Sequence, residues 1–245
     1  MNLVALIPVF NHGDTVGAVV HALRAQGLSV ILVDDGSDTP TARVLAALAA
    51  ETTGVILLSH PENRGKGAAV GAGLEYAAQQ LKASHVVQID ADGQHDLAAL
   101  PDLLQAAATR PEAVITGYPR YDKSVPGGRL YGRYLTHVWV WINTLSRHIV
   151  DSMCGFRVYP LAAVMPLLPA LRHAKRMDFD VEILVRLDWA AVPIVNLPVT
   201  VHYPVGGLSN FRPWRDNLRI SAMHARLFFG MLRRMPRLFI RRLRK

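Results

Sequence analysis

Residues 86–95 read Val-Val-Gln-Ile-Asp-Ala-Asp-Gly-Gln-His, an apolar run that ends in two aspartates two positions apart. A short run of this kind is typical of a strand that is buried on both faces of a sheet. In an open α/β sheet, ligands bind beyond the carboxyl ends of the strands. Asp90 and Asp92 at such an end can reach one hard divalent cation, and Gln94 can add a further oxygen ligand. The stretch therefore predicts a parallel sheet with a metal-binding edge.

Apolar runs alternate with helical patterns along the first half of the chain. Strands are expected at 3–9, 30–33, 55–58, 86–89 and 114–116, and helices near 14–26, 39–50, 66–82 and 96–108. Such alternation indicates a mostly parallel central sheet with helices on both faces. Beyond this part the pattern is less regular, with a loop expected at 117–128, helices near 129–148 and 178–188, and a strand near 192–201. We expect one α/β domain over residues 1–211 and an extension over 212–245.

Three further polar clusters follow predicted strands. They contain Pro8 and Asn11, then Asp34 and Asp35, then Lys66. The paired aspartates suit the base or ribose of a nucleoside, but they also suit a turn and N-cap before the helix near residue 39. The glycine-rich stretch 65–73 matches neither the P-loop nor the dinucleotide pattern. We interpret it as a tight turn that opens a helix, with Arg64 or Lys66 near a nucleotide phosphate.

The net charge of +8 comes from the C-terminal end, because residues 226–245 hold 8 of the 27 Lys and Arg residues and no acid. On a helix, one face collects Arg226, Arg233, Arg237, Arg241 and Arg244. The opposite face collects Leu227, Phe228, Met231, Leu232, Met235, Leu238 and Phe239, and Pro236 predicts a kink. A solvated helix end and a nucleic-acid arm are the alternatives. The apolar face favours an anionic membrane surface, and no nucleic acid is expected.

The composition narrows the class of protein. With 51% hydrophobic and 19% charged residues, the 245-residue chain is not disordered, fibrous or a coiled coil. Its one cysteine, Cys154, excludes a disulfide scaffold and fits a reducing compartment. We expect no membrane-spanning helix and no signal peptide. The protein is therefore expected in the cytoplasm, peripheral on the inner face of the cell membrane.

Three motifs carry a family resemblance: Val33-Asp-Asp-Gly-Ser37, Asn63-Arg-Gly-Lys-Gly67 and Asp90-Ala-Asp-Gly-Gln-His95. In this order they resemble glycosyltransferase family 2, and within it the dolichyl- and polyprenyl-phosphate hexosyltransferases. The resemblance spans roughly residues 3–211. It implies a GT-A fold, a UDP- or GDP-hexose donor, Mg²⁺ or Mn²⁺ as cofactor, a lipid-linked acceptor and transfer with inversion. It places the nucleotide sugar at Pro8, Asn11, Asp34, Asp35, Lys66, Asp90 and Ala91, and the metal at Asp90, Asp92 and Gln94.

Four arginines are candidates for the acceptor side. Arg120 lies in Gly117-Tyr-Pro-Arg-Tyr121, which resembles the family's G-S-R-Y, and Arg157 lies in Cys154-Gly-Phe-Arg157, which resembles its S-G-F-R. Arg129 and Arg133 can also bind an acceptor phosphate through charge-assisted hydrogen bonds. A phosphate acceptor needs no general base. A hydroxyl acceptor needs a carboxylate, for which Asp178, Asp180 and Glu182 are the candidates, although acids also stabilise a helix N-terminus without any catalytic role.

Two other function classes account for part of the sequence. A sugar-1-phosphate nucleotidyltransferase shares the α/β layout and the use of a metal, but its glycine-rich N-terminal signature is absent. A non-catalytic protein that binds membranes or nucleic acid explains the basic end but not four polar clusters at strand ends. The expected function is therefore an inverting, metal-dependent hexosyltransferase.

Overall fold

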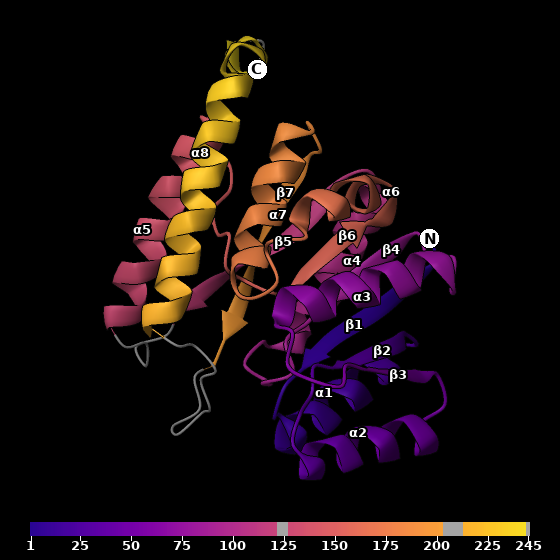
Figure 1. Cartoon of the computed structure of the whole chain (residues 1–245). Helices are drawn as coiled ribbons and strands as arrows, with labels where there is room; N and C mark the ends of the chain where they lie inside the picture. Colours follow the sequence, from indigo (N-terminus) through magenta and orange to yellow (C-terminus); the bar gives the residue numbers. More distant parts are fainter. Residues whose placement is uncertain (122–126, 203–212, 244–245) are drawn as a thin grey trace.

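The computed structural model of the chain describes residues 1–121, 127–202 and 213–243. A seven-stranded sheet with the order β3-β2-β1-β4-β6-β5-β7 lies at its centre (Figure 1). The strands are β1 (Leu3–Val9), β2 (Ser29–Asp34), β3 (Val55–Ser59), β4 (His85–Gln88), β5 (Val114–Tyr121), β6 (Arg157–Pro160) and β7 (Ile194–Val201). Among the strands of the described residues, only β6 runs antiparallel to its neighbours, β4 and β5. The mostly parallel sheet expected from the sequence is confirmed.

Helices cover both faces of the sheet, and each face has its own apolar core. Because side chains alternate along a strand, Leu6 of β1 enters one core and Ile7 enters the other. One layer contains α1 (Gly13–Ala25), α2 (Thr39–Glu51) and α4 (Leu100–Thr109), the last preceded by a 3-10 turn at Leu97–Ala99. The other layer contains α3 (Lys66–Gln79), α7 (Asp178–Trp189) and the short α6 (Leu161–Val164), which continues as a 3-10 segment over Met165–Leu171.

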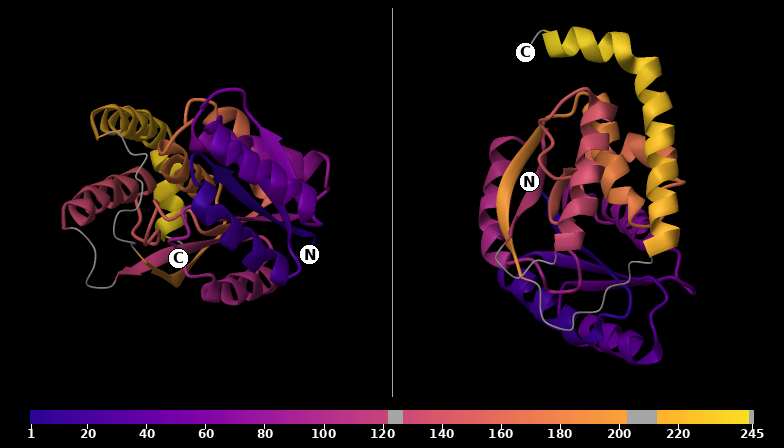
Figure 2. Two further views of the ribbon diagram at one scale, coloured as in Figure 1. Left: turned by 90° about the horizontal axis from the view of Figure 1, so that it is seen from below. Right: turned by 90° about the vertical axis from the view of Figure 1, so that its left-hand side faces the viewer.

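The two longest helices, α5 (Gly127–Thr144) and α8 (Pro213–Leu243), lie side by side next to α7 (Figures 1 and 2). The predicted apolar face of the C-terminal helix divides into two parts. Leu227, Met231 and Leu238 are buried against the protein, whereas Leu232 and Phe239 are exposed. The interpretation of this whole face as lipid-facing was therefore wrong for the buried part.

Ion pairs also tie α8 to α7. Glu182 accepts from Arg226 at 3.0 Å, and Asp188 accepts from Arg241 at 3.0 Å and Arg242 at 2.8 Å. Arg226 and Arg241, both expected on the exposed basic face of the helix, are thus paired with buried carboxylates. The helix bends sharply toward its C-terminal end (Figure 2), in the part that carries Pro236.

Some predicted boundaries differ from the structure. The loop expected at 117–128 begins too early, because β5 continues to Tyr121 and pairs with β7 along its whole length. The four-residue β6 has no counterpart among the predicted strands. The boundary expected between residues 211 and 212 lies outside the described residues, as does Arg244. None of the described helices combines the length and the apolar character needed to cross a membrane.

Candidate functional site

The site lies at the carboxyl edge of the parallel strands. β1 is flanked by β2 and β4, both parallel to it, so the segments that follow these strands meet at one edge. Lys66, in the first turn of α3, reaches across this edge. Its ammonium lies 2.6 Å from Asp90 Oδ1 and 2.7 Å from Asp180 Oδ2. One cation therefore joins the loop after β4 to the first turn of α7.

The charges of this triad support one another. Burial alone would lower the pKa of Lys66, but the carboxylates of Asp180 and Asp90 outweigh burial and raise it above its ordinary value. Burial alone would raise the pKa of Asp90, but Lys66 and His95 hold it well below its usual range. Lys66 and Asp90 are therefore held in their charged forms at neutral pH.

Asp92 lies next to this triad without an ion pair to Lys66. Its Oδ1 accepts a hydrogen bond from the backbone N–H of Gln94 at 3.0 Å. Burial, and then the neighbouring charge of Asp90, raise the pKa of Asp92 above its ordinary value. Two carboxylates that repel each other in a partly buried loop fit a divalent cation, because a cation relieves that repulsion.

The protein itself offers few metal ligands. Within the described ranges, no three His, Cys, Asp or Glu side chains come together as a metal-binding group. A cation here would be held by Asp90, Asp92 and the side-chain oxygen of Gln94, with the rest of its shell from a ligand or water. Mg²⁺ is commonly bound in this way, through one or two carboxylates plus substrate phosphates. The donor set therefore suits a site that is completed by a phosphorylated ligand.

The residues expected to hold the nucleoside line the same edge. Asn11 has a positive φ of 58°, and its Oδ1 accepts from the N–H of Asp38 at 2.9 Å. Asp34 accepts from the N–H of Ser37 at 2.9 Å. Pro8 and Ala91 are buried, with the carbonyl of Ala91 accepting from Thr15 at 2.6 Å. The turn interpretation thus describes the contact of Asp34, whereas the N-cap of α2 is Asp38, whose side chain accepts from the N–H of Thr41 at 2.9 Å.

Asp35 is buried and serves the loop that precedes α3. Its carboxylate accepts from the backbone N–H groups of Arg64 at 3.0 Å and Gly65 at 2.7 Å, and contacts His60 at 2.8 Å. Gly65 has a φ of 104°, a conformation that glycine adopts without strain. Asp35 therefore fixes the turn that aims Lys66 at the site.

The four candidate arginines lie in different surroundings. Arg157 is fully buried and donates to Tyr159 and to the carbonyl oxygens of Ser152 and Asp180. Its side chain holds the first turn of α7 in place. The guanidinium of Arg157 is buried, so an acceptor in solution cannot reach it. Arg133 forms a two-pronged contact with Asp151, Arg120 is exposed near the end of β5, and the side chain of Arg129 lies outside the described residues.

Among the three candidate bases, only Asp180 belongs to the triad. It also accepts from Gln88 at 3.2 Å, whereas Glu182 is engaged by Arg186 and Arg226. Asp178 accepts from the N–H of Arg176 at 3.0 Å and faces a separate cavity. The structure therefore sets Asp180 apart from the other two acids, because positions two apart on a helix point in nearly opposite directions, whereas Asp178 and Glu182, four residues apart, share one face.

Two contributors were not identified from the sequence. Gln88 is fully buried in β4 beneath Asp180. A Cβ built on Gly155 would come within 2.5 Å of Asp90 Oδ2, so the backbone there lies directly against the carboxylate. Gln88 could have been found as a polar side chain in an otherwise apolar strand. Gly155 could have been found as the glycine of Cys154-Gly-Phe-Arg157.

Comparison with known proteins identifies the family. The model of "Glycosyl transferase family 2" matches residues 4–164, and the chain belongs to this family. A dolichyl-phosphate beta-glucosyltransferase of Dictyostelium discoideum is 26% identical over 83% of this chain and 63% of its own length. An undecaprenyl-phosphate mannosyltransferase of Micrococcus luteus is 26% identical over 82% of this chain and 83% of its own.

Solved structures support the fold. The mannosyltransferase PcManGT of Pyrobaculum calidifontis, solved with GDP-Man and Mn²⁺, superposes with a TM-score of 0.62 over 95% of this chain and 64% of its own, at 14% identity. The expected GT-A type of α/β fold is thereby confirmed.

Proposed function

We propose that this protein transfers a hexose from a UDP- or GDP-sugar to a lipid-linked acceptor, with inversion and with Mg²⁺ or Mn²⁺. The observation that carries the proposal is the Asp90–Lys66–Asp180 triad next to Asp92 at the carboxyl edge of the sheet. Relatives named for dolichyl and undecaprenyl phosphate support a lipid acceptor, and a structural neighbour solved with GDP-Man and Mn²⁺ supports the donor and the metal.

In this proposal the bond between the anomeric carbon and the diphosphate oxygen breaks while an acceptor oxygen attacks from the opposite face. When bound, the divalent cation supplies charge stabilisation for the departing diphosphate. Lys66 adds a second positive charge near the leaving group. A phosphate acceptor arrives already ionised. If the acceptor is a hydroxyl, Asp180 takes its proton, since it is the only one of the three candidate acids in the triad.

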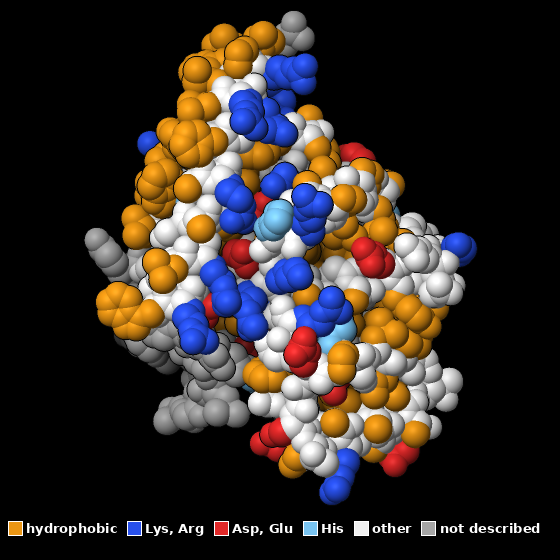
Figure 3. Space-filling model, viewed as in Figure 1, with side chains coloured by type: hydrophobic (Ala, Val, Ile, Leu, Met, Phe, Trp, Pro, Cys, Tyr) orange, Lys and Arg blue, Asp and Glu red, His pale blue; other side chains and the backbone are white. Residues whose placement is uncertain are grey.

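We also infer that the protein rests on a membrane surface through α5 and α8. The two helices carry most of the exposed large apolar side chains found among the described residues: Tyr134, Leu135, Val138, Trp139 and Ile142 on α5, and Trp214, Leu218, Phe229, Leu232, Met235 and Phe239 on α8. Apolar atoms follow the edge of α8 in Figure 3. A patch of this kind on a chain with a lipid-linked acceptor suits a bilayer interface, and the free thiol of Cys154 fits its cytoplasmic face.

The test of the activity is nucleoside diphosphate release from UDP-glucose, UDP-galactose, UDP-N-acetylglucosamine and GDP-mannose, with extracted membrane lipids as acceptor. One donor is expected to react, and only when both lipid and manganese are present. Removal of the metal with a chelator should stop release, and added manganese should restore it. Release that ignores the chelator would contradict the metal assignment, and silence with every donor would contradict the proposed transfer.

The membrane surface has its own test. Phe229→Gln combined with Leu232→Gln removes two exposed apolar side chains from α8 without touching its buried residues. Cosedimentation with lipid vesicles should weaken by at least about tenfold, because each lost side chain is worth on the order of 1 kcal/mol of transfer free energy. The control is Val44→Gln on α2, which is exposed but far from α8 (Figure 1). Equal binding by all variants would contradict the inference.

A further inference from the structure

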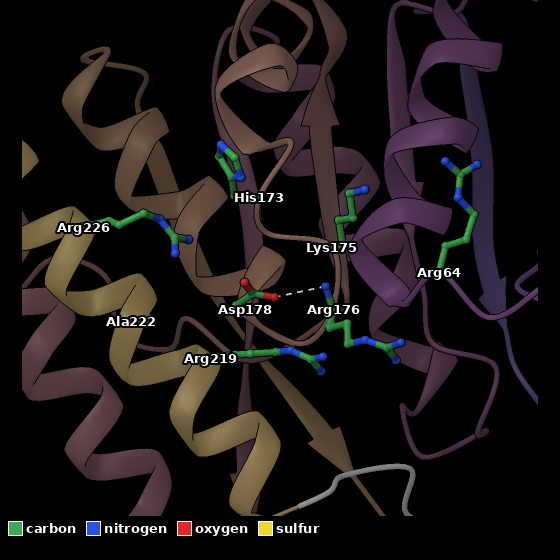
Figure 4. Close-up of a pocket in the computed structure, with 8 residues that line it drawn as sticks. All are labelled: Arg64, His173, Lys175, Arg176, Asp178, Arg219, Ala222 and Arg226. Carbon is green, nitrogen blue, oxygen red and sulfur yellow. Dashed lines mark hydrogen bonds between the residues drawn. The ribbon is translucent and has the colours of Figure 1, made fainter.

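A basic cavity opens on the other side of the first turn of α7. It has a volume of about 330 Å³ and lies between α8, the segment that precedes α7 and the loop before α3 (Figure 4). Asp178 faces it, whereas Asp180, two residues further along the helix, faces Lys66. Positions two apart on an α-helix point in nearly opposite directions. The cavity is therefore distinct from the triad.

Positive charge dominates the lining of this cavity. It contains five cationic side chains and one carboxylate, that of Asp178: the cations are Arg64, Lys175, Arg176, Arg219 and Arg226. Three of the cations have partners, since Arg176 donates to Asn63, Arg219 to Asp216 and Arg226 to Glu182. Arg64 and Lys175 form no ion pair within the described part of the chain. The charge of the cavity is thus only partly balanced.

The cavity also borders the proposed membrane surface. Arg219 and Arg226 are seven residues apart on α8 and so fall on one row, which Arg233 continues. The neighbouring row exposes Leu218, Phe229 and Leu232. In Figure 3 the basic side chains beside α8 lie next to its apolar edge. When the apolar row enters the acyl region of a bilayer, the basic row lies at the level of the headgroups.

We propose that this cavity binds the phosphate of an anionic phospholipid headgroup. Guanidinium groups suit phosphate because their planar donors contact two oxygens at once, and the lining offers several on different elements. Such a site selects anionic membranes and sets the orientation of the protein on them. The inference rests on the proposed attachment of α5 and α8 to a membrane.

The experiment compares two variants that lose the same charge. Lys175→Gln with Arg64→Gln removes one lysine and one arginine from the cavity, neither of them in an ion pair within the described residues, and Lys82→Gln with Arg43→Gln removes the same pair from exposed positions away from α8. Cosedimentation uses vesicles of phosphatidylcholine alone, with phosphatidylglycerol, or with a polyprenyl phosphate. The cavity variant should bind phosphatidylglycerol vesicles about 30-fold more weakly than wild type, with about 1 kcal/mol lost per cation. The control variant should bind nearly as well as wild type, and both should keep the wild-type melting temperature.

Each other outcome overturns the proposal in a distinct way. Equal losses in both variants would mean that only net charge matters. A loss confined to the polyprenyl phosphate vesicles would assign the cavity to the acceptor, and equally tight binding of inorganic phosphate by titration would assign it to free phosphate. Equal loss on neutral vesicles would show damage to the apolar surface. Nucleoside diphosphate release in detergent reports on the proposed transfer separately, so failure of one is not failure of the other.

Discussion

Replacing Asp92 with asparagine is expected to slow sugar transfer by about 10²–10³-fold while the fold is kept. The change removes one charge from the proposed cation site. It leaves the contacts of Lys66 with Asp90 and Asp180 in place, because the Asp92 carboxylate takes no part in those ion pairs. The measurement is nucleoside diphosphate release at increasing manganese concentration, together with a melting curve. We expect a higher manganese requirement and an unchanged melting temperature.

Two other substitutions sharpen this test. Asp102→Asn removes an exposed acid from α4 and should leave transfer unchanged. Asp90→Asn should lose transfer and stability together, because Lys66 then keeps a single buried partner. Wild-type turnover in Asp92→Asn, at the wild-type manganese requirement, would refute the role given to that carboxylate.

Substituting both Arg241 and Arg242 with methionine should destabilise the protein by about 3–5 kcal/mol, the range for a buried carboxylate that loses its partners. Asp188 is 3% exposed, and of its ion-pair partners among the described residues His148, at 3.3 Å, would remain. Urea denaturation followed by circular dichroism measures the change. Adding Asp188→Asn to the double variant should recover most of the loss, because no charge is then left unpaired.

The matched control is Arg233→Met with Arg237→Met, two exposed arginines of the same helix. Their loss should change the free energy of unfolding by less than about 1 kcal/mol. If both double variants are equally stable, α8 is not anchored through Asp188. If the anchoring holds, shortening the chain at α8 exposes its core contacts as well, so a truncated protein cannot isolate membrane binding.

The sheet was predictable because buried parallel strands leave continuous apolar runs. The run at residues 3–9 is strand Leu3–Val9 in the structure, and the polar clusters after β1, β2 and β4 do meet at one edge. The short antiparallel β6 was not predictable, because four residues carry no usable period. The helical patterns between these apolar runs explain why α1 to α4 were expected close to their observed positions.

The contacts within the site were harder to predict than its location. The sequence predicts Lys66 and Asp180 as site residues, each on its own evidence. It does not predict their ion pair, because that contact depends on how α3 packs against α7. Arg157 was expected on the acceptor side from its motif and Arg133 from its charge, yet Arg157 is buried beneath α7 and Arg133 is bound to Asp151. A motif gives residue type and order, but burial is decided by elements that are remote in the chain.

The contact between Arg226 and Glu182 has a mechanical consequence. Glu182 is two residues beyond Asp180 on the same helix. The Arg226–Glu182 ion pair therefore links α8 to the helix whose first turn holds the Lys66 ammonium. A push on α8 from a lipid surface would travel along a rigid helix of α7's length rather than through a flexible loop. Membrane binding through α8 would then shift the position of Asp180 at the site, and the rate of turnover would depend on how tightly the protein binds the membrane.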